Sequence, residues 1–201
     1  MYFVATDSFR LAEKKIKIKG ISDISKILIP YKSIVDIVRV LDVVDGNINI
    51  SFTRNQMSIF TSNIYFTTRL IDGGFPQYQI IIPKEEKTKL VVIKQDIINT
   101  LKLSNIFTDK FFQVVLNIDQ ENKKINISSK NSDIGSVVSN LDGVIDGESI
   151  EVVFNLKYFT DAFQALHGDS VSVSFTAINK PIVIKNTNDN SFLYLLMPTN
   201  K

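Results

Sequence analysis

The side chains that most often carry catalysis are sparse in this sequence. His167 is the single histidine; it follows a predicted helix and precedes Gly168-Asp169, a position typical of a residue that complements the helix dipole. The absence of cysteine excludes a thiolate nucleophile, a disulfide framework and a cysteine-based metal site. No catalytic triad, metal-ligand cluster or phosphate-binding loop has its required spacing. We therefore expect no catalytic residues, no metal and no cofactor.

The end of the sequence has the clearest potential for binding. Six apolar residues, Phe192–Met197, are followed by Pro198 and three more residues. The run is too short to span a membrane and is typical of a buried strand that a proline stops. Such a strand can contribute its last side chains to a site at the surface. The alternative, that Leu195–Pro198 are ordinary core residues, is the one that composition alone favours.

Composition is that of an ordinary globular protein. The 201 residues, 44% of them apolar and 22% charged, suffice for one large or two small domains with real cores. A net charge of +2 is too small to attract nucleic acid, so any DNA contact must come from local basic patches. The apolar start before Asp7 is too short for a signal peptide. The expectation is a cytoplasmic protein without a membrane partner.

Strands and helices alternate along the chain. A hairpin is predicted at the start, with strands at Tyr2–Ala5 and Phe9–Ala12. Helical spacing predicts helices at Tyr31–Val44, from Gln95 to Leu103 and from Leu156 to Leu166. Three strands follow each helix. The glycine-containing segment Asp142–Glu148 is interpreted as a turn.

An internal repeat is the strongest structural signal. Ile29-Pro30-Tyr31-Lys32 matches Phe154-Asn155-Leu156-Lys157, and Ser51-Phe52-Thr53 recurs as Ser174-Phe175-Thr176. The repeated unit is a strand, a helix and a three-stranded meander. Its copies span about Lys26–Leu70, Lys89–Leu141 and Ser149–Pro198. We place a domain boundary in the charged run that begins at Lys84, so that two copies make the second domain.

Several motifs together resemble the bacterial DNA polymerase III beta subunits, the beta sliding clamps of replication. Val4–Ala12 (VATDSFRLA) looks like the family's V-A-T-D-G-H-R-L-A, and Leu70–Tyr78 (LIDGGFPQY) looks like its L-[VI]-[DE]-G-x-[FY]-P-x-Y. Lys110-Phe111, Phe154–Tyr158 and Met197-Pro198 also fit. The resemblance implies an α+β DNA-clamp fold of repeated β-α-β-β-β units, with antiparallel sheets outside and helices lining an inner face.

The resemblance also implies which part of a clamp this chain represents. In the family, each subunit has three domains, and two subunits close into a homodimeric ring. Residues 1–83 look like part of the middle domain, with the second repeat unit and the tail of the first. Residues 84–201 look like the complete third domain. The sequence leaves open whether a truncation, a split gene or a partial reading frame accounts for this extent.

The implied function is that of a non-catalytic processivity factor. Such a protein tethers polymerases and repair proteins to DNA by encirclement and by capturing their peptides in a hydrophobic cleft. The expected partners are double-stranded DNA, contacted independently of sequence, the DNA polymerase III alpha subunit, the clamp loader and other proteins with a clamp-binding motif. We expect a peptide with the sequence Gln-Leu-x-Leu-Phe to bind in the cleft.

Carried over motif by motif, the cleft has two walls. The middle-domain wall comprises Thr6, Phe9, Arg10, Leu11, Pro76 and Ile81. The third-domain wall comprises Phe111, Asn155, Tyr158, Leu195, Leu196, Met197 and Pro198. Apolar and sulfur-containing side chains make an adaptable pocket. Phe9 replaces a frequent histidine, which should make its subsite more apolar; Ser8 replaces a glycine, which raises the question of whether the turn there requires positive φ.

Basic residues on the predicted helices are the candidates for contact with DNA. They are Lys32, Arg39, Lys94, Lys102 and Lys157. Contacts of this kind to phosphates position a protein without reading sequence, although scattered lysines are also typical of a plain solvated face. Lys102 and Leu103 fall at the edge where the family's ring closes between subunits. Without a first domain, these residues alone cannot close the ring.

Two other functions remain as alternatives. One is a stand-alone peptide-binding adaptor that never encircles DNA. The other is an enzyme on a related β-rich fold, which the absence of a catalytic constellation disfavours.

Overall fold

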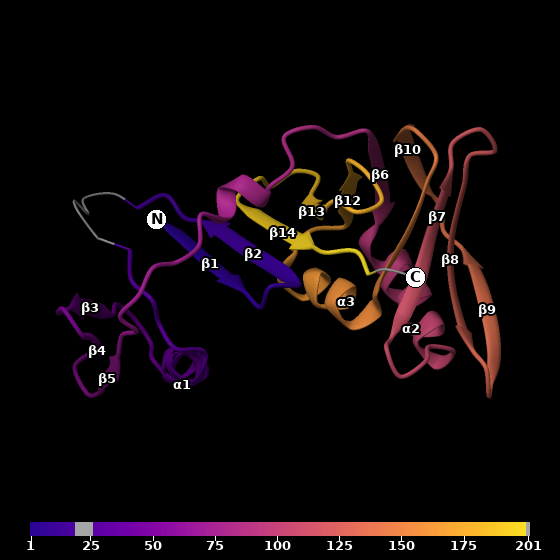
Figure 1. Cartoon of the computed structure of the whole chain (residues 1–201). Helices are drawn as coiled ribbons and strands as arrows, with labels where there is room; N and C mark the ends of the chain where they lie inside the picture. Colours follow the sequence, from indigo (N-terminus) through magenta and orange to yellow (C-terminus); the bar gives the residue numbers. More distant parts are fainter. Residues whose placement is uncertain (19–25, 200–201) are drawn as a thin grey trace. The chain divides into compact units, whose positions relative to one another are not determined.

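The structure is a computed structural model that describes residues 1–18 and 26–199. The chain divides into two compact units (Figure 1). Unit 1 combines Met1–Ile18 with Tyr78–Lys201, and unit 2 comprises Lys19–Gln77. None of the helices in the described ranges is long and apolar enough to cross a membrane.

Unit 1 contains a seven-stranded antiparallel sheet in which the two ends of the chain meet. Its strands, in spatial order, are β1 (Tyr2–Thr6), β2 (Arg10–Lys15), β14 (Phe192–Leu196), β13 (Ile182–Asn186), β12 (Ser170–Phe175), β6 (Thr88–Ile93) and β10 (Gly143–Gly147). The strand β14 lies between β2 and β13, and all five of its side chains are buried. The apolar run near the end of the sequence is therefore an internal strand, as predicted.

A second sheet and two helices complete unit 1. The four-stranded sheet has the order β11 (Ile150–Asn155), β7 (Gln113–Asp119), β8 (Lys124–Asn131) and β9 (Gly135–Asn140). The helices are α2 (Lys94–Ile106) and α3 (Leu156–Ala165). One hydrophobic core contains residues from both helices and both sheets, among them Leu90, Leu101, Val114, Phe159 and Val173.

The two repeats of unit 1 exchange their first strands. The strand β6 opens one repeat but pairs with β12 of the other, and β11 opens the second repeat but pairs with β7 of the first. Each sheet therefore contains strands from both copies, and neither copy has a core of its own. This arrangement confirms that two predicted copies of the repeat fold together.

Unit 2 contains a single copy of the repeat. Its elements are α1 (Tyr31–Asp42) and the antiparallel strands β3 (Asn49–Phe52), β4 (Gln56–Phe60) and β5 (Tyr65–Arg69). Its core is small, with Ile37, Met57 and Ile59 buried between α1 and the sheet. The prediction of a strand that begins at Lys26 is wrong. Among the described residues of unit 2, this segment makes an isolated bridge between Leu28 and Ile71.

The segment Asp142–Glu148, predicted as a turn, contains the edge strand β10. Its two glycines suggested a turn, but one of them is required by strand packing. A Cβ atom on Gly143 would lie 2.7 Å from Val92 Cγ1 and 2.8 Å from the Val91 carbonyl oxygen. A glycine therefore lets β10 approach β6 closely enough to pair.

Candidate functional site

The turn between β1 and β2 is fixed by its own side chains. Asp7 Oδ1 accepts hydrogen bonds from the backbone N–H groups of Phe9 (3.1 Å) and Arg10 (3.0 Å), and Thr6 Oγ1 donates to the carbonyl oxygen of Arg10 at 2.8 Å. Ser8 has φ of 76°, so the turn does require positive φ. Strand β2 begins at Arg10, one residue later than predicted. The result is a rigid turn that presents the Phe9 side chain, 57% exposed, to solvent.

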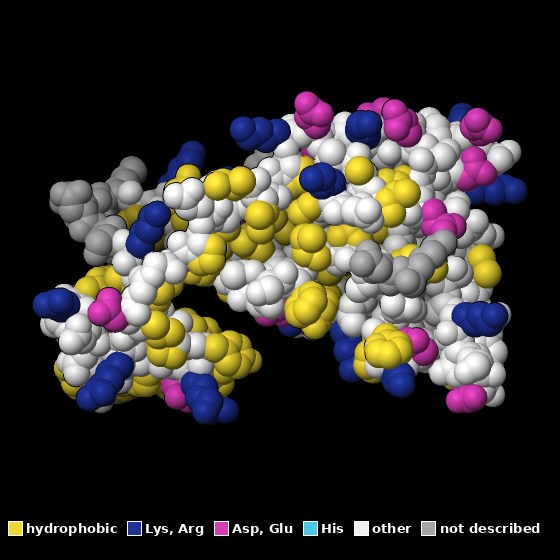
Figure 2. Space-filling view, viewed as in Figure 1, with side chains coloured by type: hydrophobic (Ala, Val, Ile, Leu, Met, Phe, Trp, Pro, Cys, Tyr) yellow, Lys and Arg dark blue, Asp and Glu magenta, His cyan; other side chains and the backbone are white. Residues whose placement is uncertain are grey.

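The chain end lies directly beside this turn. Leu195 pairs with Leu11, and Leu196 pairs with Arg10. The ladder continues past β14, because the Met197 N–H donates to the carbonyl oxygen of Phe9 at 2.8 Å. Figure 2 shows hydrophobic side chains gathered over β2 and β14. The backbone thus places Met197 next to Phe9 at the end of the central strand.

Arg10 connects the hairpin to α3. Its guanidinium forms ion pairs with Asp7 at 2.8 Å and with Asp161, and it lies 4.5 Å from the centroid of the Tyr158 ring. Burial would lower the pKa of Arg10, but its hydrogen bonds to the two carboxylates raise that pKa further above its ordinary value. Arg10 therefore stays charged while its planar group covers one face of the tyrosine.

Tyr158 is held from several sides. The Phe9 ring stacks near it, with centroids 6.0 Å apart and an interplanar angle of 26°. The Tyr194 hydroxyl donates to the Tyr158 carbonyl oxygen at 2.7 Å, and burial is the main cause that raises the pKa of Tyr194 to about 12. Phe9, Arg10 and Tyr158 thus form an aromatic and cationic cluster that can receive an apolar or aromatic side chain.

Asn155 organises the start of α3. Its Oδ1 accepts from the N–H groups of Lys157 (3.0 Å) and Tyr158 (3.2 Å), and its Nδ2 donates to the carbonyl oxygen of Phe111 at 3.0 Å. It is the N-cap of the helix. Because both ends of its amide are occupied, Asn155 positions Tyr158 and Phe111, the latter 59% exposed.

The remaining predicted cleft residues divide into three groups. Leu11, Leu195 and Leu196 are 2% exposed or less, so they support the site from the interior and are not surface contacts in this structure. Met197 and Pro198 are partly buried. Ile81 ends the short 3-10 helix η1 (Tyr78–Ile81) in unit 1 and is 49% exposed. Pro76 belongs to unit 2 and is exposed there.

η1 is joined to β2 by a buried polar contact. The Tyr78 hydroxyl donates to Glu13 Oε2 at 2.5 Å, and Glu13 is 3% exposed. Glu13 also pairs with Lys15 at 3.2 Å. Burial, followed by this carboxylate, raises the pKa of Tyr78 to about 12. This contact places η1, and with it Ile81, against the strand that carries Leu11.

Two residues that position the cluster were missed by motif comparison. Asp161 holds the Arg10 guanidinium, and Tyr194 supports Tyr158. The internal repeat contained a signal for the first, because Asp161 falls where Asp36 does, and Asp36 pairs with Arg39 at 3.3 Å within its own helix.

The basic side chains predicted to face DNA differ in their exposure and in their contacts. Lys32 and Lys102 are exposed. Arg39 is exposed and paired with Asp36. Lys94 Nζ donates to the Leu166 carbonyl oxygen at 2.5 Å, and Lys157 Nζ lies 3.4 Å from the centroid of the Phe112 ring. Leu103, predicted at a subunit edge with Lys102, is 54% exposed on α2.

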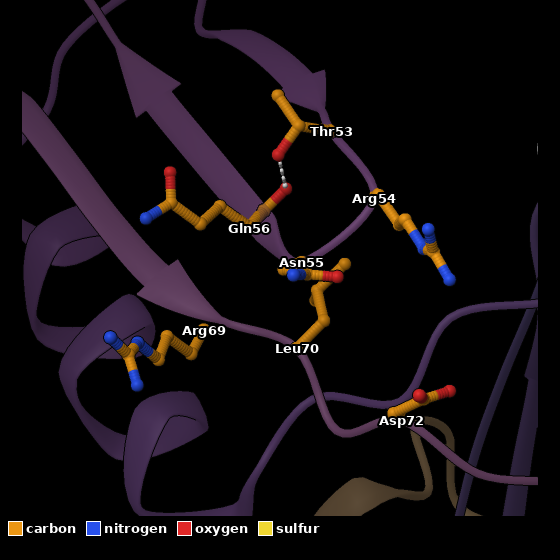
Figure 3. Close-up of a pocket in the computed structure, with 7 residues that line it drawn as sticks. All are labelled: Thr53, Arg54, Asn55, Gln56, Arg69, Leu70 and Asp72. Carbon is orange, nitrogen blue, oxygen red and sulfur yellow. Dashed lines mark hydrogen bonds between the residues drawn. The ribbon is translucent and has the colours of Figure 1, made fainter.

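A separate hollow of about 640 Å³ lies in unit 2. Its lining, drawn in Figure 3, consists of Thr53, Arg54, Asn55, Gln56, Arg69, Leu70 and Asp72. The guanidinium groups of Arg54 and Arg69 point in different directions in this view, so they do not converge on one ligand. None of the predicted site residues lines this hollow, and we assign no function to it.

The strand-exchanged pair of repeats defines a DNA-clamp fold, and comparison with solved structures supports this class. The crystal structure of the DNA polymerase sliding clamp from Bacillus subtilis matches with a TM-score of 0.93 and 30% identity, covering 100% of this chain and 53% of that one. The beta subunit from Thermotoga maritima matches with a TM-score of 0.92 and 26% identity, over 98% and 54% of the two chains.

Sequence comparison identifies the family. Residues 1–77 match the central domain of the DNA polymerase III beta subunit, and residues 79–200 match its C-terminal domain. The chain belongs to the DNA polymerase III beta subunit family. The beta sliding clamp of Bacillus subtilis is 31% identical over 197 residues, and that of Staphylococcus aureus strain Mu50 is 27% identical over 195. This chain spans about half the length of these relatives, 52% in each case.

Proposed function

We propose that this chain is the peptide-capturing half of a sliding clamp, a non-catalytic processivity factor. It tethers polymerases and repair proteins, including the DNA polymerase III alpha subunit and the clamp loader, to double-stranded DNA. Residues 1–83 act as part of the middle domain and residues 84–201 as the third domain. Membership of the family supports this proposal, because the relatives are named beta sliding clamps.

The main support for peptide binding in this proposal is the cluster of Phe9, Arg10 and Tyr158 beside Met197. It presents aromatic faces and a partly buried thioether at one surface of unit 1. Apolar groups with a few polar anchors at the rim are typical of sites that take a short hydrophobic motif. The leucine and phenylalanine side chains of the bound motif are the groups that these residues fit.

Calorimetry with a peptide containing Gln-Leu-x-Leu-Phe tests the proposal. Met197→Ala should weaken binding by about 1–2 kcal/mol, roughly 5- to 30-fold, because it truncates a side chain next to Phe9. Val144→Ala, at the opposite edge of the seven-stranded sheet and 67% exposed, is the matched control and should leave affinity unchanged. Equal peptide affinity in the two variants would contradict the assignment of Met197 to the peptide-binding site.

The adaptor that does not encircle DNA is the second candidate. The engagement of Lys94 with Leu166 and of Lys157 with the Phe112 ring favours it, because these ammonium groups already have partners. Fluorescence anisotropy with a DNA duplex over a range of salt concentrations separates the two. Clamp-like contact requires affinity that falls as salt rises, whereas an adaptor binds the peptide and leaves DNA unbound at every salt concentration.

A further inference from the structure

The apolar run that contains β14 has its single sulfur atom at the residue where the run leaves the core. All five residues of β14 are buried, whereas Met197, the next residue, is only partly buried. The chain contains three methionines and no cysteine, so a peroxide that reaches the protein meets thioethers and no thiolate. Which thioether reacts then depends on how far each one is shielded from solvent.

The three thioethers have different surroundings. Met57 is 6% exposed and belongs to the core of unit 2. Met1 is 41% exposed and lies at the open end of the β1–β2 hairpin, where its amino group donates to the Ile16 carbonyl oxygen at 2.8 Å. Met197 lies beside the turn at the other end of that hairpin. A dissolved oxidant should therefore reach Met1 and Met197 before Met57, and only Met197 belongs to the proposed peptide site.

The backbone is held on both sides of Met197. Its N–H donates to the carbonyl oxygen of Phe9 at 2.8 Å, and the N–H of Thr199 donates to the carbonyl oxygen of Val153 at 2.8 Å. Between these two bonds, Pro198 has a fixed φ and favours an extended conformation at Met197. The backbone at Met197 therefore cannot move away from Phe9 without breaking a hydrogen bond, and the thioether stays at the site whether or not it is oxidised.

The hydrogen-bond donors of the neighbouring cluster are already engaged. Arg10 forms ion pairs with two carboxylates, and the Tyr194 hydroxyl donates to the carbonyl oxygen of Tyr158. A sulfoxide oxygen on Met197 is a polar acceptor that water can solvate in the free protein, because this side chain is partly exposed. A bound apolar side chain would exclude that water and leave the oxygen without a donor, which is unfavourable.

We propose that Met197 is a site of reversible oxidation and that its sulfoxide form releases the bound peptide. In the reaction with hydrogen peroxide, the thioether sulfur is oxidised by two electrons and forms one S–O bond. The O–O bond of the peroxide breaks, and its second oxygen leaves as water. Methionine sulfoxide reductases reverse the change: a dithiol is oxidised to a disulfide, and the sulfoxide oxygen leaves as water. This inference rests on the peptide-binding proposal and adds regulation by oxidation to the same site.

Calorimetry of the full chain before and after treatment with hydrogen peroxide tests the proposal. The probe is a peptide that contains Gln-Leu-x-Leu-Phe and no sulfur. Mass spectrometry of proteolytic fragments should find one added oxygen on Met1 and on Met197, while Met57 stays largely reduced. Peptide affinity should fall by about 10-fold or more and should return after treatment with the two methionine sulfoxide reductases, one for each epimer.

Two leucine substitutions separate the effects of the three sulfur atoms. Met197→Leu removes the reactive sulfur, so peroxide should not change its peptide affinity, whatever the starting value. Met57→Leu is the matched control, because it keeps Met197, and peroxide should still weaken its binding. Urea denaturation should give closely similar midpoints for the oxidised and reduced natural chain, which distinguishes a change at the site from loss of the fold.

Three results overturn the proposal. One is complete oxidation of Met197 with unchanged peptide affinity. Another is an equal loss of affinity in peroxide-treated Met197→Leu, and the third is oxidation of Met197 that is no faster than that of the buried Met57. A reduced natural chain that does not bind the peptide contradicts the peptide-binding proposal itself, so the two proposals fail by different results.

Discussion

Ser8 occupies a backbone conformation that a side chain disfavours. Its φ of 76° lies in the left-handed region, where a non-glycine residue costs about 1 kcal/mol or more. We therefore predict that Ser8→Gly raises the free energy of unfolding by about 0.5–1 kcal/mol, measured by urea denaturation. The opposite sign is expected for Ser136→Gly in β9, because glycine weakens a strand. If both substitutions destabilise, the turn is not strained.

Tyr78 anchors η1 through a carboxylate that has little access to water. Tyr78→Phe removes the donor to Glu13, which is 3% exposed. We predict a loss of about 1–3 kcal/mol in unfolding free energy at neutral pH. Tyr65→Phe, at a site 72% exposed, should change it by less than about 0.5 kcal/mol. Thermal unfolding monitored by circular dichroism gives both values.

The same hydroxyl predicts a dependence on alkaline pH. The pKa of Tyr78 is raised from 10.0 to about 12 in the folded state, so its contribution to stability is fully present below pH 10 and is lost as pH rises through about 12. Unfolding free energy should therefore fall more steeply over this range in the natural protein than in Tyr78→Phe. Identical slopes would show that the contact does not shift the titration.

At this scale, motif comparison indicated which residues belong to the proposed site but not how deeply each side chain is buried. Met197 and Leu196 are neighbours in one apolar run, yet Leu196 is completely buried and Met197 is only partly buried. The difference depends on where β14 leaves the sheet, which is set by its pairing with β2. The repeat indicated Asp161 by its match with Asp36, but not that its partner would be Arg10. The role of Tyr194 was not predictable, because it contacts Tyr158 through the fold and not through a motif.

Among the elements, β10 depends on a glycine that the sheet leaves no room to replace. Gly143→Ala would place a methyl group 2.7 Å from Val92 Cγ1 and 2.8 Å from a backbone oxygen. We predict destabilisation by about 1–3 kcal/mol, measured by urea denaturation. Gly74→Ala meets no atom within 4 Å and should stay within about 0.5 kcal/mol of the natural protein.

The elements with regular apolar spacing were the most predictable. Both α3 and β11 begin within a residue of their predicted starts, because the Asn155 cap and the apolar positions after it are local signals. Local signals predicted the wrong structure for β10, which was expected to be a turn, and for the segment before α1, which was expected to be a strand. The first pairs with β6, about fifty residues earlier in the chain; the second lacks a partner strand among the described residues of unit 2.

For the whole molecule, the two units should differ in stability. The core of unit 1 includes residues of both sheets and two helices, whereas that of unit 2 is built around Ile37, Met57 and Ile59. We predict that backbone amides of β3, β4 and β5 exchange with deuterium through a lower-energy opening than those of β12 and β14. Mass spectrometry of dilute protein measures this. Equal protection of β4 and β14 would contradict it.

The repeat and the family were both predictable from the sequence, because the repeated motifs are short and local. The exchange of first strands between repeats was not. Strands β6 and β11 each pair with a meander that belongs to the other copy, and apolar periodicity indicates a strand without indicating its neighbour.

The position of β14 between β2 and β13 also determines when the protein can finish folding during its synthesis. Strand β2 ends at Lys15 and β14 begins at Phe192, so the ribosome must add all the intervening residues before the sheet can close. At about 5–20 residues per second, this takes on the order of 10–30 s. Throughout that time the β1–β2 hairpin keeps an unpaired edge on the β2 side, and a nascent chain is most exposed there to chaperones or to premature pairing. The residues that complete the proposed peptide site are also the ones whose synthesis lets the sheet close.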